Sequence, residues 1–229
     1  MTEIRGYTAQ GFEPVRDAFA ANFEDDEELG AGFAVMLDGE TVVDLQGGWA
    51  DRKKTHVWDA ETLVPVFSTT KGVAALVIGM LLDRSVGELT YDTAVASIWL
   101  EFAAQGKDKV TIGQMLSHQA GLPGFAEEID PALWLNPPAC AAAIAALPPL
   151  WAPGTAHGYH PLTWGYLVGE LAKRIDGRTL GTILREDICA PAGIDFQIGL
   201  PEADHARCAD IQRPRALAAL GGIIDLTEG

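Results

Sequence analysis

Large apolar residues near the N-terminus follow two different rhythms. Those at three- and four-residue steps are Phe12, Val15, Phe19 and Phe23. This spacing predicts an amphipathic helix over roughly residues 11–24. Two short apolar runs, residues 32–37 and 41–45, flank Asp38 and Gly39, a dipeptide favoured in tight hairpin turns. We therefore expect a two-stranded antiparallel sheet and a helix that is one candidate to cover it.

After residue 50 the pattern becomes helical, and no strand signal of comparable clarity follows. Nearly every side chain in residues 73–82 is apolar, which predicts a largely buried helix that begins near Ser68. A short apolar segment follows Asp92 and ends at Trp99. Capping residues, prolines and glycines predict four further helices: after Thr111, from Asn136 to Pro148, from Leu162 to Gly177, and from Thr179 to just before Pro191.

These elements predict an α/β (α+β) fold in which an antiparallel sheet region is joined to a mostly helical region. Residues 1–66 would form the N-terminal part of the sheet region, and residues 67–229 would hold the helix at Ser68 and the later helices. With 229 residues, 48% of them hydrophobic, the chain can bury a sizeable core.

Charge and cysteine content exclude several classes of function. The net charge of −16 repels nucleic-acid phosphates and anionic membranes, so neither is expected as a partner. The three cysteines, Cys140, Cys189 and Cys208, are odd in number and lack C-x-x-C spacing, which argues against a disulfide framework or a zinc site. The N-terminus carries no secretory pattern, and the apolar run at 73–82 is too short to span a bilayer. We expect a cytoplasmic protein.

Ser68 and Lys71 stand three residues apart where the apolar helix begins. This spacing places both side chains on one face of the first turn. Burial and the positive end of the helix dipole both disfavour a charged lysine there, and a neutral amine beside a hydroxyl is a base beside a nucleophile. Taken alone, Ser-x-x-Lys is more often an N-capping serine followed by a solvated lysine. Other motifs have to decide between these interpretations.

Two further stretches favour the catalytic interpretation. They are Gln114-Met115-Leu116-Ser117-His118-Gln119-Ala120-Gly121-Leu122-Pro123 and the segment from Pro153 to Leu171, which contains Tyr159. With Ser68-Thr69-Thr70-Lys71, their order and spacing resemble the serine β-lactamase and penicillin-binding protein superfamily, and most closely the family VIII carboxylesterases related to class C β-lactamases. The resemblance runs from about Gly32 to Ile194 and implies a β-lactamase/transpeptidase-like fold.

The resemblance also implies roles for three residues. Ser68 would be the acylated nucleophile, Lys71 would help to remove its proton, and Tyr159 would pass a proton to the leaving group as a general acid. A core tyrosine among neighbouring aromatic residues is the alternative for Tyr159. Pro161 stands two residues beyond Tyr159, where the β-lactamases usually carry an asparagine that binds the amide of the substrate. This difference argues against recognition of a lactam side chain.

The histidines of the chain suggest a pocket rather than a metal site. His157 and His160 flank Tyr159, and with Trp164 they are candidates to line the substrate pocket. His118 lies in a stretch that looks like a structural loop of the family, so we expect a structural role for it. The five histidines, His56, His118, His157, His160 and His205, show no metal-ligand spacing, and no cofactor is implied.

The sequence therefore predicts a serine hydrolase that cleaves small carboxylic esters through an acyl-enzyme on Ser68. There is no G-x-S-x-G elbow, which counts against an ordinary α/β-hydrolase. A β-lactamase or D-Ala-D-Ala peptidase remains an alternative, as does a binding module or inactive fragment that is acylated without turnover. The oligomeric state stays open.

The resemblance further implies parts that this sequence does not contain. Family members add three central strands, a third motif of the K-T-G kind and a second oxyanion-hole amide. The segment 213–222 is expected to be a helix or turn that leads toward them. The 229 residues alone would then be unstable, associate through open strand edges, or lack activity.

Overall fold

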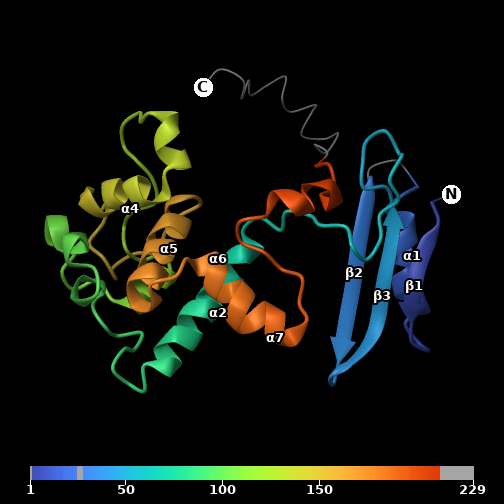
Figure 1. Ribbon diagram of the computed structural model, residues 1–229, viewed down its shortest axis with the longest axis horizontal. Coiled ribbons are helices and arrows are strands. Elements are labelled where there is room, and N and C mark those ends of the chain that lie inside the picture. The colour runs from blue at the N-terminus through green and yellow to red at the C-terminus, as the bar shows by residue number, and fades with distance from the viewer. Residues whose placement is uncertain (1, 25–27, 212–229) are drawn as a thin grey trace. The chain divides into compact units, whose positions relative to one another are not determined.

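The computed structural model describes residues 2–24 and 28–211 (Figure 1). Two compact units are present. The first comprises the described residues up to Pro65 together with those from Leu200 onward, and the second comprises Val66–Gly199. The expected helix or turn at 213–222 lies outside the described residues.

An antiparallel sheet forms most of the first unit. Its strands are β1 (Ile4–Thr8), β2 (Gly30–Leu37) and β3 (Glu40–Gly48), in the order β1-β3-β2 (Figure 1). The β2–β3 hairpin turns at Asp38 and Gly39, and this prediction is confirmed.

The expectation of only two strands was wrong, because β1 pairs with β3 from Ile4 opposite Gly47 to Thr8 opposite Val43. Gly6 interrupts the apolar pattern of this short strand. Its φ is 104°, and a Cβ at this position would lie only 2.0 Å from the carbonyl oxygen of Asp44, which explains why a glycine stands there. Gly6 thus allows β1 to approach β3, and the same glycine weakens the strand pattern in the sequence.

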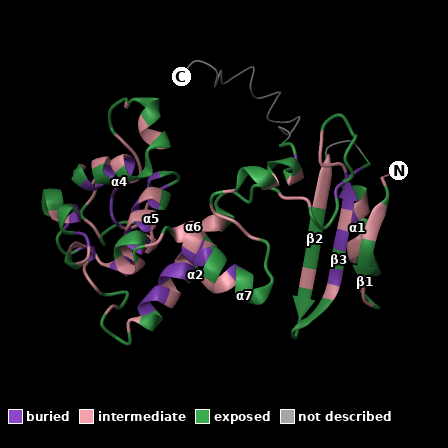
Figure 2. Ribbon diagram, in the orientation of Figure 1, coloured by how far each residue is buried: buried purple, intermediate pink, exposed green. Residues whose placement is uncertain are grey.

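Helix α1 (Glu13–Ala21) packs on this sheet. Phe19 and Phe23 are buried with Val43 and Leu45 of β3, and the two phenylalanine rings meet edge to face at 5.4 Å. Figure 2 shows buried positions alternating along β3, as expected for a strand with one covered face. The predicted helix at 11–24 therefore covers the hairpin. A 3-10 helix, Glu202–Arg207, also belongs to this unit.

The second unit is built of helices joined by loops. Its α-helices are α2 (Thr69–Arg84), α3 (Ile112–Leu116), α4 (Pro137–Ala146), α5 (Thr163–Asp176), α6 (Leu180–Ile183) and α7 (Ala190–Ala192). The 3-10 helices are Val95–Ser97, Leu100–Gly106 and Pro131–Leu135, and a π-helical segment spans Leu184–Cys189. Helix α5 packs against both α2 and α4. The core lies among these helices and includes Val77, Ile78, Leu81, Ile144, Leu167 and Leu171, so the strongly buried α2 is held from several sides (Figure 2).

Local signals set the ends of these helices. Thr111 and Gln114 form a complete capping box at α3, and the Asn136 side chain accepts the amide of Ala139 at the start of α4. Gly177, with φ of 90°, ends α5. One predicted boundary was wrong, since helical structure continues through Pro191. That proline lies in the first turn of α7, after the π-helical segment, where a missing amide hydrogen costs little.

Burial also accounts for two of the cysteines. Cys140 and Cys189 are buried, whereas Cys208 is exposed, and all three are free thiols. None of the described helices is long and apolar enough to cross a membrane.

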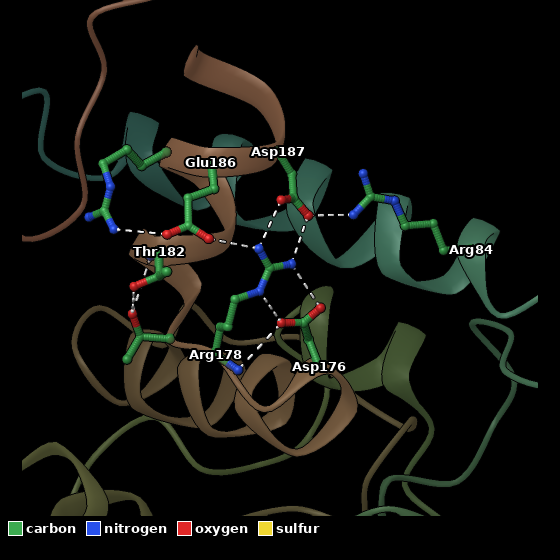
Figure 3. Close-up of polar contacts among 8 residues, drawn as sticks. Arg84, Asp176, Arg178, Thr182, Glu186 and Asp187 are labelled. Carbon is green, nitrogen blue, oxygen red and sulfur yellow. Dashed lines mark hydrogen bonds and ion pairs between the residues drawn. The ribbon is translucent and has the colours of Figure 1, made fainter. Parts of the chain in front are cut away.

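Arg178 joins the end of α5 to the π-helical segment through its guanidinium group. It donates to both carboxylate oxygens of Asp176 at 2.6 and 3.0 Å, to both of Asp187 at 2.8 and 2.9 Å, and to Glu186 at 3.0 Å. Arg84, at the end of α2, donates to Asp187 as well. Figure 3 shows Arg178 between the carboxylates, with Arg84 reaching Asp187 from the opposite side. This bidentate network ties α2, α5 and the π-helical segment together.

These ion pairs give stability a defined pH dependence. The Arg178 hydrogen bonds lower the pKa of Asp187, with help from Arg84, and also lower the pKa of Asp176. A carboxylate with a depressed pKa stabilises the fold above its unfolded-state pKa, and that contribution is lost as the pH falls through the folded-state pKa. We expect Arg178→Ala to lower the thermal midpoint clearly at pH 7 and less at pH 2–3.

Arg185→Ala is the matched control for that measurement. Arg185 contacts Glu186 at 3.4 Å, and its side chain is 56% exposed. A pair this exposed contributes little to stability, so its removal should change the midpoint slightly at either pH. Equal losses for the two variants would contradict the structural role of Arg178.

Candidate active site

Ser68 immediately precedes helix α2 and has helical backbone angles. Its side chain does not cap the helix within the described chain, so the N-capping interpretation does not apply and the Oγ is left for other partners. The preceding Phe67 has φ of 45°, an unusual value for a bulky residue, and its ring is 72% exposed. The Ser68 N–H donates to no atom of the described residues. An unpaired amide beside the hydroxyl is a candidate oxyanion donor.

Lys71 lies one turn along α2 on the same face as Ser68. Its Nζ donates to the Ser68 Oγ at 3.3 Å and to the carbonyl oxygen of Pro161 at 2.9 Å. The same Nζ lies 5.0 Å from the ring centroid of Tyr159 and 5.9 Å from that of Trp164. Two hydrogen bonds and two ring faces thus hold the amine beside the serine.

Tyr159 completes the group, 91 residues along the chain from Ser68. The phenol Oη donates to the Ser68 Oγ at 2.5 Å, which is shorter than the distance from Lys71. The hydrogen bond with Ser68, a second one with Lys71 and the charge of Lys71 together lower the pKa of the Tyr159 phenol. The structure therefore brings the three residues singled out in the sequence together, and the phenol, whose pKa is lowered, lies closest to the hydroxyl.

His118 lies against this phenol. Its ring centroid is 4.9 Å from that of Tyr159, and its Nδ1 accepts the backbone N–H of His160 at 3.1 Å. Burial, His160, His157 and Lys71 lower the pKa of His118 to about 4. The imidazole is thus neutral at pH 7, and because Nδ1 accepts, the proton is on Nε2.

The expected placement of His160 in the substrate pocket is corrected by the structure. The His160 side chain is 1% exposed, its Nε2 accepts the N–H of Leu122 at 2.9 Å, and its Nδ1 lies 2.5 Å from the carbonyl oxygen of Gly158. Both ring nitrogens are therefore used inside the protein. Burial lowers the pKa of His160, in keeping with a neutral ring that joins two loops.

The other two expected pocket residues differ in position. Trp164 is buried and lines a cavity next to Ser68, and its Nε1 donates to the carbonyl oxygen of Leu116. His157 is exposed, lies edge-on to His118 at 6.0 Å and is not among the residues that line that cavity. Of the three, only Trp164 borders the space beside the nucleophile.

This cavity has a volume of about 320 Å³, and Ser68 is among the residues that line it. Its polar members are Ser68, Thr70 and Lys71, and its apolar side chains are Phe67, Ala74, Pro161, Leu162, Trp164, Leu180 and Ile198. Sequence reasoning missed Leu180 and Ile198, because nothing in their local pattern shows that they return to a helix more than a hundred residues earlier. Another cavity, of about 700 Å³, borders α1 and β1 in the first unit and contains none of these groups.

The described residues provide no metal centre. No group of three or more His, Cys, Asp or Glu side chains among them lies close enough to hold an ion.

Comparison with known proteins gives this geometry a family context. The chain is 38% identical over 210 residues to the esterase/beta-lactamase LipL of Mycobacterium tuberculosis. The aligned residues cover 91% of this chain and 48% of LipL. Among solved structures, a penicillin-binding protein homologue from Caulobacter crescentus superposes with a TM-score of 0.89 at 55% identity, over 93% of this chain and 57% of that one. A family VIII carboxylesterase superposes with a TM-score of 0.85 at 43% identity, over 96% of this chain and 61% of that one.

The chain spans about half the length of the curated relatives it matches. The family model named Beta-lactamase matches residues 15–225, a range that includes strands β2 and β3 and the three residues Ser68, Lys71 and Tyr159. The β-lactamase/transpeptidase-like fold expected from the motifs is confirmed, and the chain belongs to the Beta-lactamase family.

Proposed function

We propose that the protein is a serine hydrolase of carboxylic esters that works through an acyl-enzyme on Ser68. The observation that carries this proposal is the Ser68 Oγ held 2.5 Å from the Tyr159 Oη and 3.3 Å from the Lys71 Nζ. A hydroxyl becomes a strong nucleophile when a base within hydrogen-bond reach takes its proton. The likeness to an esterase/beta-lactamase and to a family VIII carboxylesterase supports the same reaction class.

In the acylation step the ionised phenol of Tyr159 takes the proton of Ser68 while the Oγ attacks the ester carbonyl. Tyr159 suits this role better than Lys71 because its oxygen is closer and its pKa is lowered. The ammonium of Lys71 stabilises the phenolate that the step requires. The Ser68 N–H, which has no partner among the described residues, can stabilise the negative charge that develops on the carbonyl oxygen.

The tetrahedral intermediate then collapses, and the bond to the alcohol breaks. Tyr159 returns its proton to the departing alkoxide, so the alcohol leaves neutral and the acyl group stays on Ser68. In the second half, Tyr159 takes a proton from water, the resulting hydroxide attacks the acyl carbon, and the carboxylic acid and free Ser68 are released. Every proton moves between the phenol, the serine, water and the substrate, so no cofactor is needed.

The cavity beside Ser68 favours an apolar substituent on the ester. Its lining is dominated by Leu162, Trp164, Leu180 and Ile198, and a volume of about 320 Å³ is at the small end for ligand pockets. A short acyl or alkoxy chain can therefore be buried there, and the loss of its contact with water contributes to binding.

Labelling with a fluorophosphonate followed by intact-mass and peptide mapping tests the proposal directly. We expect one adduct per chain, located on Ser68, together with release of more than one equivalent of product from a short-chain chromogenic ester. Labelling without turnover would leave an acylatable binding protein, and labelling at another serine would overturn the assignment.

We further expect short-chain esters to be hydrolysed more efficiently than cephalosporins, by about 100-fold in kcat/KM. Pro161 has no side-chain donor for a lactam amide, and its carbonyl oxygen is already bound to Lys71 at 2.9 Å. The measurement compares a chromogenic acetate or butyrate ester with a chromogenic cephalosporin.

Pro161→Asn is the informative variant, because asparagine supplies the missing amide donor and keeps the backbone carbonyl that binds Lys71. This variant should lower the ratio of kcat/KM for the ester to kcat/KM for the cephalosporin. Equal efficiency toward both substrates in the unchanged protein would contradict the expected preference.

A further inference from the structure

His118 grips the backbone on both sides of Tyr159. Its carbonyl oxygen accepts the N–H of Gly158 at 3.2 Å, and its Nδ1 accepts the N–H of His160 at 3.1 Å. The imidazole also lies on the phenol itself, with ring centroids 4.9 Å apart. One residue therefore contacts the positions before, at and after Tyr159, and we call these three contacts the His118 clasp.

The backbone of His118 is itself set for this role. Its φ is 64°, in the left-handed region, where asparagine, aspartate and histidine are the commonest residues other than glycine. On the far side, Gly158 lies under Trp151, and a Cβ at this glycine would be 2.6 Å from the indole. The segment that carries Tyr159 is thus confined between Trp151 and His118.

The position of Tyr159 needs such support because the phenol has little of its own. Its side chain is 50% exposed, and its Oη donates to the Oγ of Ser68, which is itself a reacting group. A displacement of about 1 Å in a catalytic group can cost about 100-fold in rate. We propose that His118 is a positioning residue that holds the Tyr159 phenol in reach of Ser68 and Lys71 through its Nδ1 acceptor and its ring. The inference rests on the proposed function, because it concerns the proton carrier of that reaction.

The chemistry of the clasp specifies the variants that test it. In asparagine the Oδ1 occupies the place of the histidine Nδ1, and asparagine tolerates the left-handed backbone. Glutamine places its oxygen one bond further out, where it cannot accept the His160 amide. His118→Asn should therefore keep kcat within about tenfold, whereas His118→Gln should lower kcat by about 100-fold with KM little changed.

A double-variant cycle separates positioning of Tyr159 from a general effect on folding. If His118 acts through Tyr159, His118→Gln should lower kcat by about threefold or less in a Tyr159→Phe background, because the phenol that it positions is already absent there. Thermal midpoints of each variant record any loss of folding, and His205→Gln, at an exposed histidine of the first unit, is the matched control.

Titration of the tyrosine phenols by ultraviolet difference absorbance gives a readout that does not depend on turnover. Subtracting the titration curve of the Tyr159→Phe variant isolates the absorbance change of Tyr159, whose pKa should be lower than that of an ordinary tyrosine. His118→Gln should raise the pKa of the Tyr159 phenol, because the phenol then moves away from Ser68 and Lys71. His118→Asn should leave this pKa unchanged. This arm remains decisive even if the unchanged protein hydrolyses no ester, an outcome that would count against the proposed function alone. Equal behaviour of the Asn and Gln variants, or a full His118→Gln effect in the Tyr159→Phe background, would overturn the clasp.

Discussion

Replacement of Ser68 by alanine abolishes ester turnover and fluorophosphonate labelling, which is the largest effect we expect of any single substitution. The Oγ is the atom on which both Tyr159 and Lys71 converge, at 2.5 and 3.3 Å, so its removal leaves these two groups without a nucleophile to activate. Loss of a nucleophile in a comparable hydrolase costs about six orders of magnitude in kcat. The expected result is turnover indistinguishable from the buffer rate, measured on a short-chain chromogenic ester.

Folding should survive this change, because the Ser68 side chain caps no helix within the described chain and is exposed. A thermal midpoint equal to that of the unchanged protein would attribute the loss to chemistry. Ser97→Ala is the matched control, since this exposed serine donates to the carbonyl oxygen of Ala94, away from the residues around Ser68. Normal turnover by Ser68→Ala would show that another residue is the nucleophile.

The elements that local sequence signals specify are those that the structure bears out. The Asp38-Gly39 turn joins β2 to β3, and the Thr111 capping box and Gly177 bound α3 and α5 where they were expected. Each of these signals acts between residues a few positions apart, so a reader of the sequence can evaluate it without a fold. The family motifs extended this reach to the fold class as a whole.

Features that depend on distant residues could not be predicted in the same way. Strand β1 is concealed by Gly6, which is required only because β3 approaches so closely. His160 was expected in the pocket because it directly follows Tyr159 in sequence, yet its ring turns inward to meet the amide of Leu122. Leu180 and Ile198 reach the cavity by tertiary packing alone.

His118 shows both sides of this limit. Its motif suggested a structural role, but the sequence did not indicate which residues His118 would hold in place. The two hydrogen bonds to the residues flanking Tyr159 exist only once segments about forty positions apart are folded together. A structural histidine and a positioning histidine look alike in the sequence, and contact with a reacting group distinguishes them.

The second large effect concerns Tyr159 and Lys71, the two partners of the Ser68 hydroxyl. We expect Tyr159→Phe and Lys71→Ala each to lower kcat/KM by two or more orders of magnitude, since losing acid–base assistance usually costs about 10²–10⁴-fold. Tyr159→Phe keeps the ring that packs on His118 and removes only the Oη. Lys71→Ala removes the cation that supports the phenolate. Tyr91→Phe and Lys109→Ala change the same residue types at exposed sites and serve as controls.

The two losses should not add, because in the proposed mechanism Lys71 acts through Tyr159 by stabilising its phenolate. We expect the kcat/KM of the double variant to be close to that of the less active of the two single variants. The pH profile provides an independent sign: the hydrogen bond and charge of Lys71 help to lower the pKa of Tyr159, so Lys71→Ala should move the acid limb of kcat/KM to higher pH. An acid limb that stays in place, or a Tyr159→Phe variant within threefold of the unchanged enzyme, would contradict a phenolate base and leave Lys71 as the group that takes the Ser68 proton.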